Sequence, residues 1–412
     1  MTRPQTLRSG DLAALLPRRG TVLVQGCSGA SDRLAEMVAM EGEALGALEF
    51  TGIQVPGVNH HEWLANPRCR FTTFFMTPEL RAAGSAVTFL PLSYGEILRR
   101  WRTAPPEAAL FSVSPPDEHG TCSFGPTVDF LAELWPRIPL RIAQINPLLP
   151  RTSGPTGIPF NRLHAVVEAE DSLPMVAETE DSPVASSIAK QIAAFIDDGA
   201  TLQTGLGALP GAMLRALRDH RRLRIHSGLI GNATLDLLEA GAIDKGSDVV
   251  TGVAIGTRRL YDALSASGIA FHPVSHTHSP GVLATLANLV TINSTMEIDL
   301  YGQGFSEVAG TSWNSGVGGD GDFARGALAA GGLRIVAIAA TAHGRSRIVS
   351  AGSGRGPVTL GRADIDIVVT EHGAADLRSL SHEQRAASLV AIADPAARDD
   401  LVNSWRRGPG RY

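Results

Sequence analysis

The first 150 residues of the chain alternate short apolar runs with amphipathic stretches. The apolar runs have the length of buried strands, and they cover residues 21–25, 48–55, 86–91, 108–113 and 140–146. The amphipathic stretches are typical of helices, and they cover residues 7–16, 32–43 and 94–101. Because parallel strands need helical crossovers of this kind, the pattern predicts an α/β fold with a doubly wound parallel sheet.

The same order of elements returns later in the chain. Residues 21–43 have the pattern of a strand, a glycine turn and a helix, and residues 199–217 repeat it. The repeat predicts two related domains. A polar run at 168–183 is expected to link them, which gives the domain boundaries 1–180 and 181–412.

The second half continues the alternation of strands and helices. A helix is expected at 184–196, with Ser182 or Asp181 as its N-cap and a proline at its first position. Further strands are expected at 333–339 and 365–370, and a further helix at 381–392.

One stretch joins a strand pattern to a glycine-rich turn. Residues 290–300 keep an apolar rhythm near period two, which predicts one strand. Residues 315–323 then place four glycines within six positions and lead into a helix beginning at Phe323. A glycine turn at a helix start presents free N–H groups and the positive end of the helix dipole, which suit an oxyanion or a phosphate. The alternative is a loop that only turns the chain.

Composition narrows the class of protein. At 412 residues the chain exceeds one ordinary core, and a net charge of -5 without a long basic block argues against nucleic acid as a main partner. No apolar run reaches ~18 residues and no signal-peptide pattern opens the chain, so we expect no membrane partner.

The cysteines and one histidine pair bear on metal binding and redox chemistry. The three cysteines are widely spaced, which predicts a cytoplasmic protein without structural disulfides or a zinc cluster. Cys27 follows a strand but has no base beside it in the sequence, so we interpret it as a packing residue. His60 and His61 are interpreted as pocket-lining or surface residues, because no ligand pattern accompanies them. We expect no metal.

Four segments, in this order along the chain, resemble the acetyl-CoA hydrolase/transferase family, which includes the acetate and 4-hydroxybutyrate CoA-transferases. They are Ser114–Gly120 with Ser123 and Gly125, Gly205–Pro210, the pieces of Asn293–Ala327 that include Ser315–Phe323, and Val368–Leu377. The resemblance implies two related CoA-transferase-like α/β domains with the active site in the cleft between them. It also implies coenzyme A, bound as an acyl-CoA substrate, with a small carboxylate, water or another nucleophile as acceptor. A homodimer is compatible with it.

The resemblance also implies which residues hold the substrate. Gly205 and Gly207 are expected to face the acyl thioester or the pantetheine arm of coenzyme A. Loop amides at Gly316, Gly318 and Gly319, with the region of Asn293, are expected to stabilise an oxyanion. Several arginines could meet the phosphates of coenzyme A, although each is also ordinary as a solvated side chain: Arg258, Arg259, Arg325, Arg345 and Arg347.

Residue 228 departs from the family pattern. Members carry a glutamate two residues after the position of His226, and its carboxylate attacks the thioester to give a mixed anhydride and then a glutamyl-CoA thioester. This chain has Gly228 at that position. Glycine has no side chain, so we predict that no glutamyl-CoA forms there.

Three hypotheses remain for a site without this glutamate. The chain transfers the acyl group directly or hydrolyses the thioester, with His226, His276 or His278 as a base by residue type. Alternatively, it binds acyl-CoA without catalysis. In the third hypothesis another carboxylate such as Glu297 has taken over, although Glu297 matches a residue that the family has beside its nucleophile. His276 and His278 would share a face of an extended loop, which would suit weak metal binding, but we interpret them as surface residues in that arrangement.

Overall fold

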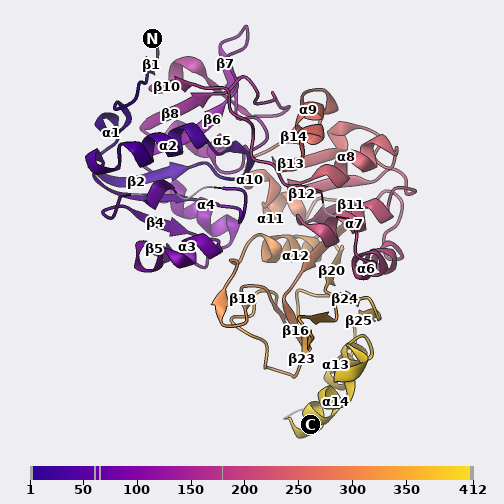
Figure 1. The fold of residues 1–412 in the computed structure, drawn as a ribbon. Coiled ribbons are helices and arrows are strands. Elements are labelled where there is room, and N and C mark those ends of the chain that lie inside the picture. Colours follow the sequence, from indigo (N-terminus) through magenta and orange to yellow (C-terminus); the bar gives the residue numbers. More distant parts are fainter. Residues whose placement is uncertain (1–2, 60–61, 65, 179, 409–412) are drawn as a thin grey trace. The chain divides into compact units, whose positions relative to one another are not determined.

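The computed structural model describes residues 3–59, 62–64, 66–178 and 180–408, so His60 and His61 lie outside the described residues. The chain forms two compact units, which Figure 1 shows as strands alternating with helices. The first unit comprises Met1–Ala177 and Val249–Thr277, and the second comprises Glu178–Asp248 and His278–Tyr412.

The first unit is built on an eight-stranded sheet in which every neighbouring pair is parallel. Across the sheet the strands are β1 (Gln5–Thr6), β10 (Ala165–Glu168), β8 (Leu140–Ile145), β6 (Ala108–Val113), β2 (Arg19–Val24), β3 (Ala47–Gly52), β4 (Arg70–Thr73) and β5 (Val87–Phe89). The helices of this part are α1 (Leu12–Leu15), α2 (Asp32–Met40), α3 (Pro78–Ala82), α4 (Tyr94–Thr103) and α5 (Leu131–Leu134). The predicted α/β fold with parallel sheets is confirmed.

The remaining elements of the first unit are smaller. They are the antiparallel pair β7 (Thr121–Ser123) and β9 (Gly157–Pro159), the parallel pair β13 (Val249–Ala254) and β14 (Ala270–Phe271), and the helices α9 (Arg258–Ser267) and α10 (Val274–Thr277). The bridge between Thr127 and Val253 ties β13 to the loop after β7.

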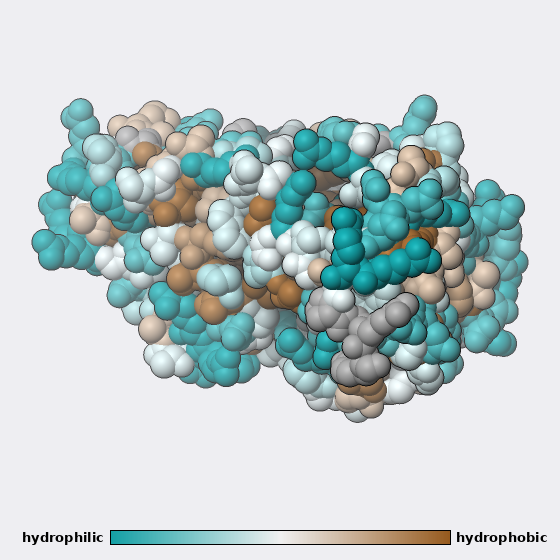
Figure 2. Space-filling view, turned by 90° about the horizontal axis from the view of Figure 1, so that it is seen from below, coloured by the Kyte–Doolittle hydropathy of each residue, from teal (hydrophilic) through white to brown (hydrophobic). Residues whose placement is uncertain are grey.

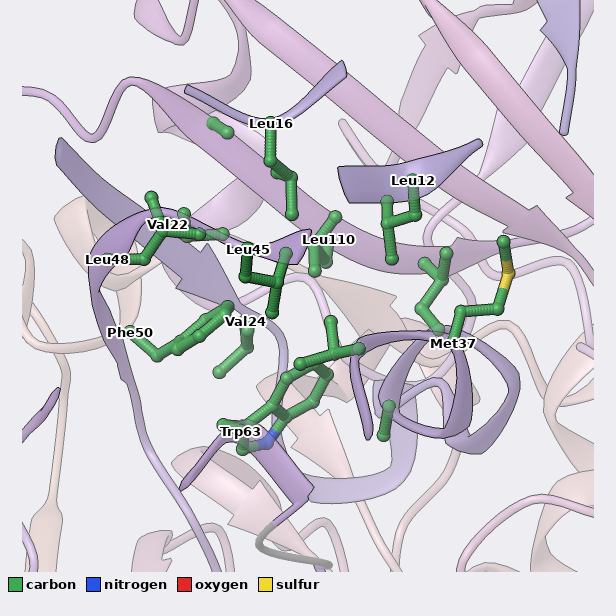
Figure 3. Packing of buried hydrophobic residues seen from close by; sticks show 14 of the residues in the cluster. Leu12, Leu16, Val22, Val24, Met37, Leu45, Leu48, Phe50, Trp63 and Leu110 are labelled. Carbon is green, nitrogen blue, oxygen red and sulfur yellow. The ribbon is translucent and has the colours of Figure 1, made fainter. Parts of the chain in front are cut away.

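The core of the first unit explains why its strands read as unbroken apolar runs. All six residues of β6 are buried, as expected for a strand covered on both faces. Val22 and Val24 of β2 lie in one buried cluster with Met37 of α2, Phe50 and Trp63 (Figure 3). The rings of Phe50 and Trp63 have centroids 5.6 Å apart. Burying a side chain of this size stabilises the fold by roughly 1.5–3 kcal/mol.

The second unit has its own main sheet. Its strands lie in the order β12 (Arg224–Ile230), β11 (Thr201–Thr204), β15 (Leu289–Ser294), β20 (Leu333–Ala337), β24 (Ile367–Thr370) and β25 (Gly373–Asp376). All neighbouring pairs are parallel except β24 with β25. The helices of this unit are α6 (Pro183–Ala193), α7 (Ala208–Ala216), α8 (Asn232–Glu239), α11 (Pro280–Leu283), α12 (Asp320–Ala329), α13 (His382–Ala391) and α14 (Arg398–Arg407).

The second unit also contains short strands outside the main sheet. A small sheet holds β17 (Gly304–Phe305), β16 (Glu297–Asp299) and β23 (Ile348–Val349). Two antiparallel pairs join β18 (Val308–Ala309) with β19 (Ser312–Trp313), and β21 (Thr341–Ala342) with β22 (Arg345–Ser346).

The order of strands in the second unit creates a topological switch point. From β11 the chain forms β12 on one side, and it later returns to place β15 on the other side. In open parallel sheets ligands bind outside the carboxyl ends of strands that part in this way. The carboxyl ends of β11 and β15 are therefore the place in this unit to look for a site.

Several element boundaries differ from the prediction. The strand predicted at 290–300 is wrong as one element, because β15 ends at Ser294 and β16 belongs to the small sheet. The helix expected at 7–16 is confined to α1, and α12 begins at Asp320 rather than at Phe323. The N-cap of α6 is Ser182, whose Oγ accepts a hydrogen bond from the N–H of Ala185 at 3.1 Å.

One face of the molecule is drawn in Figure 2. It carries many hydrophilic residues, with apolar residues exposed between them. Within the described residues no helix is long and apolar enough to cross a membrane.

Candidate active site

A polar pair lies at the switch point of the second unit. Gln203 near the end of β11 donates a hydrogen bond from Nε2 to Oδ1 of Asn293 near the end of β15, at 3.1 Å. Both side chains are buried. The Oε1 atom of Gln203 has no hydrogen-bond partner within the described part of the chain. A buried acceptor left unpaired costs about 1–3 kcal/mol, so this atom marks a place where a ligand N–H group would be stabilised.

The loop after β11 leads directly into α7. Gly205, Leu206 and Gly207 are exposed, and no side chain caps the N-terminus of α7. The first N–H groups of this helix are therefore not satisfied by a capping side chain. The expectation that Gly205 and Gly207 face the thioester or the pantetheine arm stays a prediction.

The neighbouring strand β12 carries His226 and Gly228 on one face. Residues two apart along a strand point to the same side, and Ser227 between them points the other way. The Oγ of Ser227 donates a hydrogen bond to the carbonyl oxygen of Thr204 at 2.7 Å, which fixes this part of β12 against the end of β11. His226 is buried, at 3% exposure.

The space beside Gly228 is filled by His278, which lies just before α11. A Cβ atom built on Gly228 would lie 2.6 Å from Cε1 and 2.9 Å from Nε2 of the His278 ring. Contacts below 3.0 Å are essentially never made by a real Cβ. Any side chain at residue 228 would therefore have to displace the imidazole.

The same ring closely approaches the start of α12. A Cβ atom on Gly319, the N-cap of α12, would lie 2.6 Å from Nε2 of His278. The ring centroid of His278 is 4.6 Å from that of Phe323 on α12. The Nε2 atom of His278 thus faces both Gly228 and the N-terminus of α12.

Burial determines the protonation of two groups here. Burial foremost, and then the neighbouring His226, lower the pKa of His278 to about 3, so its imidazole is neutral at pH 7. Asp320 in the first turn of α12 is partly exposed, and desolvation raises the pKa of its carboxyl to about 7. A helix N-terminus favours a carboxylate, so desolvation outweighs the dipole at Asp320.

The other candidates from the sequence lie in different surroundings. His276 is in α10 of the first unit, where its ring stacks on His272 with centroids 4.2 Å apart. Because α10 is a helix, the expectation of an extended loop with His276 and His278 on one face is wrong. The carboxylate of Glu297 accepts a hydrogen bond from the backbone N–H of Arg355 at 2.9 Å. It also lies 3.6 Å from the guanidinium of Arg355.

The remaining candidate groups are Cys27 and any metal cluster. Cys27 is buried, and burial foremost, followed by the nearby Asp129, raises the pKa of its thiol far above the usual range. This thiol is therefore inert at neutral pH. Across the described ranges, no group of three or more histidine, cysteine or acidic residues could hold a metal ion.

Among the candidates from the sequence, the second unit contains His226, Gly228, Asn293 and the glycine loop at 315–323. The sequence analysis did not single out Gln203 or Asp320 as candidates. Gln203 could have been found as a polar residue near the end of an apolar strand before a glycine turn. The raised pKa of the Asp320 carboxyl depends on desolvation by the surrounding fold, which no local sequence pattern reveals.

Comparison with known proteins assigns the chain to a family. The family model for the acetyl-CoA hydrolase/transferase C-terminal domain matches residues 256–405. The chain is 36% identical over 332 residues to 4-hydroxybutyrate coenzyme A transferase of Clostridium kluyveri, with 77% of each chain covered. The chain belongs to the acetyl-CoA hydrolase/transferase family. The curated relatives of this chain include CoA-transferases and an acetyl-CoA hydrolase.

Solved structures agree with the assignment to the acetyl-CoA hydrolase/transferase family. RipA from Yersinia pestis superposes with a TM-score of 0.89 at 27% identity, covering 98% of this chain and 97% of that one. A 4-hydroxybutyrate CoA-transferase from Porphyromonas gingivalis superposes with a TM-score of 0.79 at 29% identity, with the same coverage.

Proposed function

We propose that this member of the family acts on acyl-CoA thioesters by hydrolysis or by direct acyl transfer, without a glutamyl intermediate at residue 228. The observation that carries the proposal is the packing at Gly228, which has no side chain and whose side-chain space is filled by His278. The nucleophile that the family resemblance implies here is absent, and a side chain in its place would have to move the His278 ring.

The surrounding groups support a retained thioester site. The unpaired Oε1 of Gln203 would accept a hydrogen bond from an amide of the pantetheine arm, which fits a coenzyme A ligand at the switch point. The amides at the start of α12 suit the oxyanion that forms when a thioester carbonyl is attacked. One oxyanion donor is worth ~2.7–4 kcal/mol of transition-state stabilisation, so the loss of the covalent step need not end catalysis.

The chemistry balances without an enzyme-bound acyl group. In hydrolysis the oxygen of water forms a bond to the thioester carbon, the C–S bond breaks, and the thiolate leaves with the bonding pair. The proton released by water ends on the thiol. In transfer, a small carboxylate attacks instead and gives a mixed anhydride, which the thiolate of coenzyme A opens to give the new thioester and the released acid.

Two alternatives compete with this proposal. A non-catalytic acyl-CoA-binding protein would retain Gln203 and the glycine loops but turn nothing over. A transferase using another carboxylate would need one near the thioester, and Asp320 is better placed for this than Glu297, whose carboxylate is held by Arg355.

Mass spectrometry separates the three possibilities. The purified protein is incubated with acetyl-, butyryl-, succinyl- and 4-hydroxybutyryl-CoA, with and without acetate, and treated with borohydride or hydroxylamine. Release of coenzyme A and acid is followed in the same samples. We expect thioester turnover with no modified carboxylate. A trapped adduct on Asp320 or Glu297 would replace the proposal with a covalent mechanism, and binding without turnover would establish the binding-protein alternative.

A further inference from the structure

The second unit contains a cavity of about 480 Å³ that the proposed thioester chemistry does not use. Its lining comes from the segment directly after β15, the hairpin of β18 and β19, the hairpin of β21 and β22, and Arg355. β15 and β20 are neighbours in the main sheet, and the first and third of these segments follow their carboxyl ends. Ligands of open parallel sheets bind at this edge, in pockets of roughly 300–1,000 Å³. The cavity therefore has the position and the size of a ligand site.

The charged side chains of this cavity are mostly cationic. Arg345, Arg347 and Arg355 line it together with one carboxylate, that of Glu297. Glu297 is engaged with Arg355, through the backbone N–H at 2.9 Å and the guanidinium at 3.6 Å. Within the described part of the chain, neither Arg345 nor Arg347 forms an ion pair. Two guanidinium charges in one cavity therefore have no ionic partner in the protein.

The guanidinium of Arg347 is held in place by the backbone after β15. Its Nε donates a hydrogen bond to the carbonyl oxygen of Met296 and its Nη2 donates one to that of Thr295, both at 2.6 Å. Burial foremost lowers the pKa of Arg347, and the carboxylates of Glu297 and Glu371 oppose this effect. A guanidinium fixed in this way loses little conformational entropy when it binds an anion, and the anion would offset its desolvation.

We propose that this cavity binds a phosphate group through Arg345, Arg347 and Arg355. Guanidinium groups hold phosphate oxygens with pairs of N–H groups. A phosphate carries a charge of about −1.5 to −2, which matches the two guanidinium charges without an ionic partner. Of the five arginines named from the sequence, the cavity thus selects Arg345 and Arg347, whereas Arg258 already bonds to Asp262 at 2.7 Å. The inference does not depend on the proposed thioester chemistry.

Such a phosphate has two sources that binding measurements distinguish. One is the nucleotide end of coenzyme A, which carries a diphosphate and a 3′-phosphate. The other is a free phosphate compound, for which inorganic phosphate and ADP are the probes. The shared chemistry is a phosphate group facing the arginines, so both sources depend on the same side chains.

Two changes in the cavity and their matched controls test the proposal. Arg345→Gln removes an exposed guanidinium, and Arg345→Lys keeps the charge without the paired N–H groups. Ala342→Glu places a carboxylate in the cavity, and Ala342→Gln has the same size without the charge. Arg218→Gln removes an exposed arginine that follows α7 and does not line this cavity. We expect phosphate affinity to fall ~10–100-fold in Arg345→Gln and Ala342→Glu, less in Arg345→Lys, and not in the two controls.

Isothermal titration calorimetry at constant ionic strength measures the affinities. The ligands are inorganic phosphate, ADP, coenzyme A, dephospho-coenzyme A and pantetheine. If coenzyme A supplies the phosphate, the wild type prefers it over pantetheine by ~10-fold or more and Arg345→Gln loses this preference. Dephospho-coenzyme A then shows whether the 3′-phosphate or the diphosphate is held. If a free compound supplies it, ADP or inorganic phosphate binds while coenzyme A is bound, and Arg345→Gln leaves the affinity for coenzyme A unchanged.

The remaining outcomes are equally decisive. Wild-type affinity for every phosphate ligand in both Arg345→Gln and Ala342→Glu, or an equal loss in Arg218→Gln, would overturn the proposal. If Ala342→Glu does not fold, Arg345→Gln decides, because it changes an exposed side chain. Phosphate binding without turnover of any acyl-CoA would refute the proposed function and support this site. Turnover by a wild type whose affinities ignore the phosphate groups would refute this site alone.

Discussion

At residue 228 a side chain and the present position of His278 compete for the same space. A Cβ on Gly228 would lie 2.6 Å from Cε1 of His278, so the imidazole would have to move before a side chain could fit. Restoring a glutamate at residue 228 is therefore a change at two positions.

The coupling predicts the behaviour of reverted variants. Gly228→Glu alone should be destabilised by roughly 1–3 kcal/mol, because the new side chain forces His278 out of its place. We expect no borohydride-trapped glutamyl adduct in this variant. Gly228→Glu combined with His278→Gly makes room for the carboxylate, and an adduct at residue 228 is expected there.

Urea unfolding and peptide mass mapping measure the two effects. His278→Gly alone is the matched control, since it opens the space without supplying a carboxylate and should form no adduct. If Gly228→Glu alone had wild-type stability and formed the adduct, the ring of His278 would not be the obstacle.

At the scale of elements, two glycines at the start of α12 differ in their surroundings. Gly319 lies close to His278, and Gly321 does not. A Cβ on Gly319 would meet Nε2 of His278 at 2.6 Å, whereas a Cβ on Gly321 would meet only the tip of Arg325 at 3.7 Å. Neither residue has a positive φ, so the contrast between them is steric.

This contrast predicts opposite results for two similar substitutions. Gly319→Ala should lower kcat at least tenfold and lower stability, because α12 or His278 must shift. Gly321→Ala lies inside the helix and should leave turnover unchanged while stabilising the protein by up to about 1 kcal/mol, since alanine has the higher helix propensity. Steady-state kinetics and thermal unfolding measure both. Equal effects of the two substitutions would contradict the contact with His278.

At the scale of the whole molecule, the sequence predicted the layers of the fold better than the assembly of the site. Strands such as β6 are buried on both faces, so each gives an apolar run that local pattern detects. The prediction of one strand at 290–300 was wrong. The alternation of apolar and polar residues continues from β15 into β16, although these two strands belong to different sheets. Gly228 and the glycine loop could be named from the sequence, but the contact of Gly228 with His278 joins distant segments and depends on the complete fold.

The titration of His278 connects this local contact to the stability of the chain. The pKa of His278 is lowered to about 3, first by burial and then by His226. An unfolded histidine has a pKa near ~6.5, so between these values the unfolded chain binds the proton that the folded chain refuses. Stability is therefore lost as pH falls from about 6.5 toward 3, by about 1.4 kcal/mol per pH unit for this one proton.

The His278→Gln variant isolates this contribution. Asp320 and Asp129 have raised pKa values and oppose it by binding protons more tightly in the folded chain, so the wild type must be compared with the variant at each pH. We expect the difference in unfolding free energy, wild type minus variant, to fall steadily from pH 6.5 to pH 4. Urea unfolding followed by circular dichroism measures this difference. A pH-independent difference for His278→Gln would mean that His278 has the same pKa in the folded and the unfolded chain, so that burial does not keep its imidazole neutral.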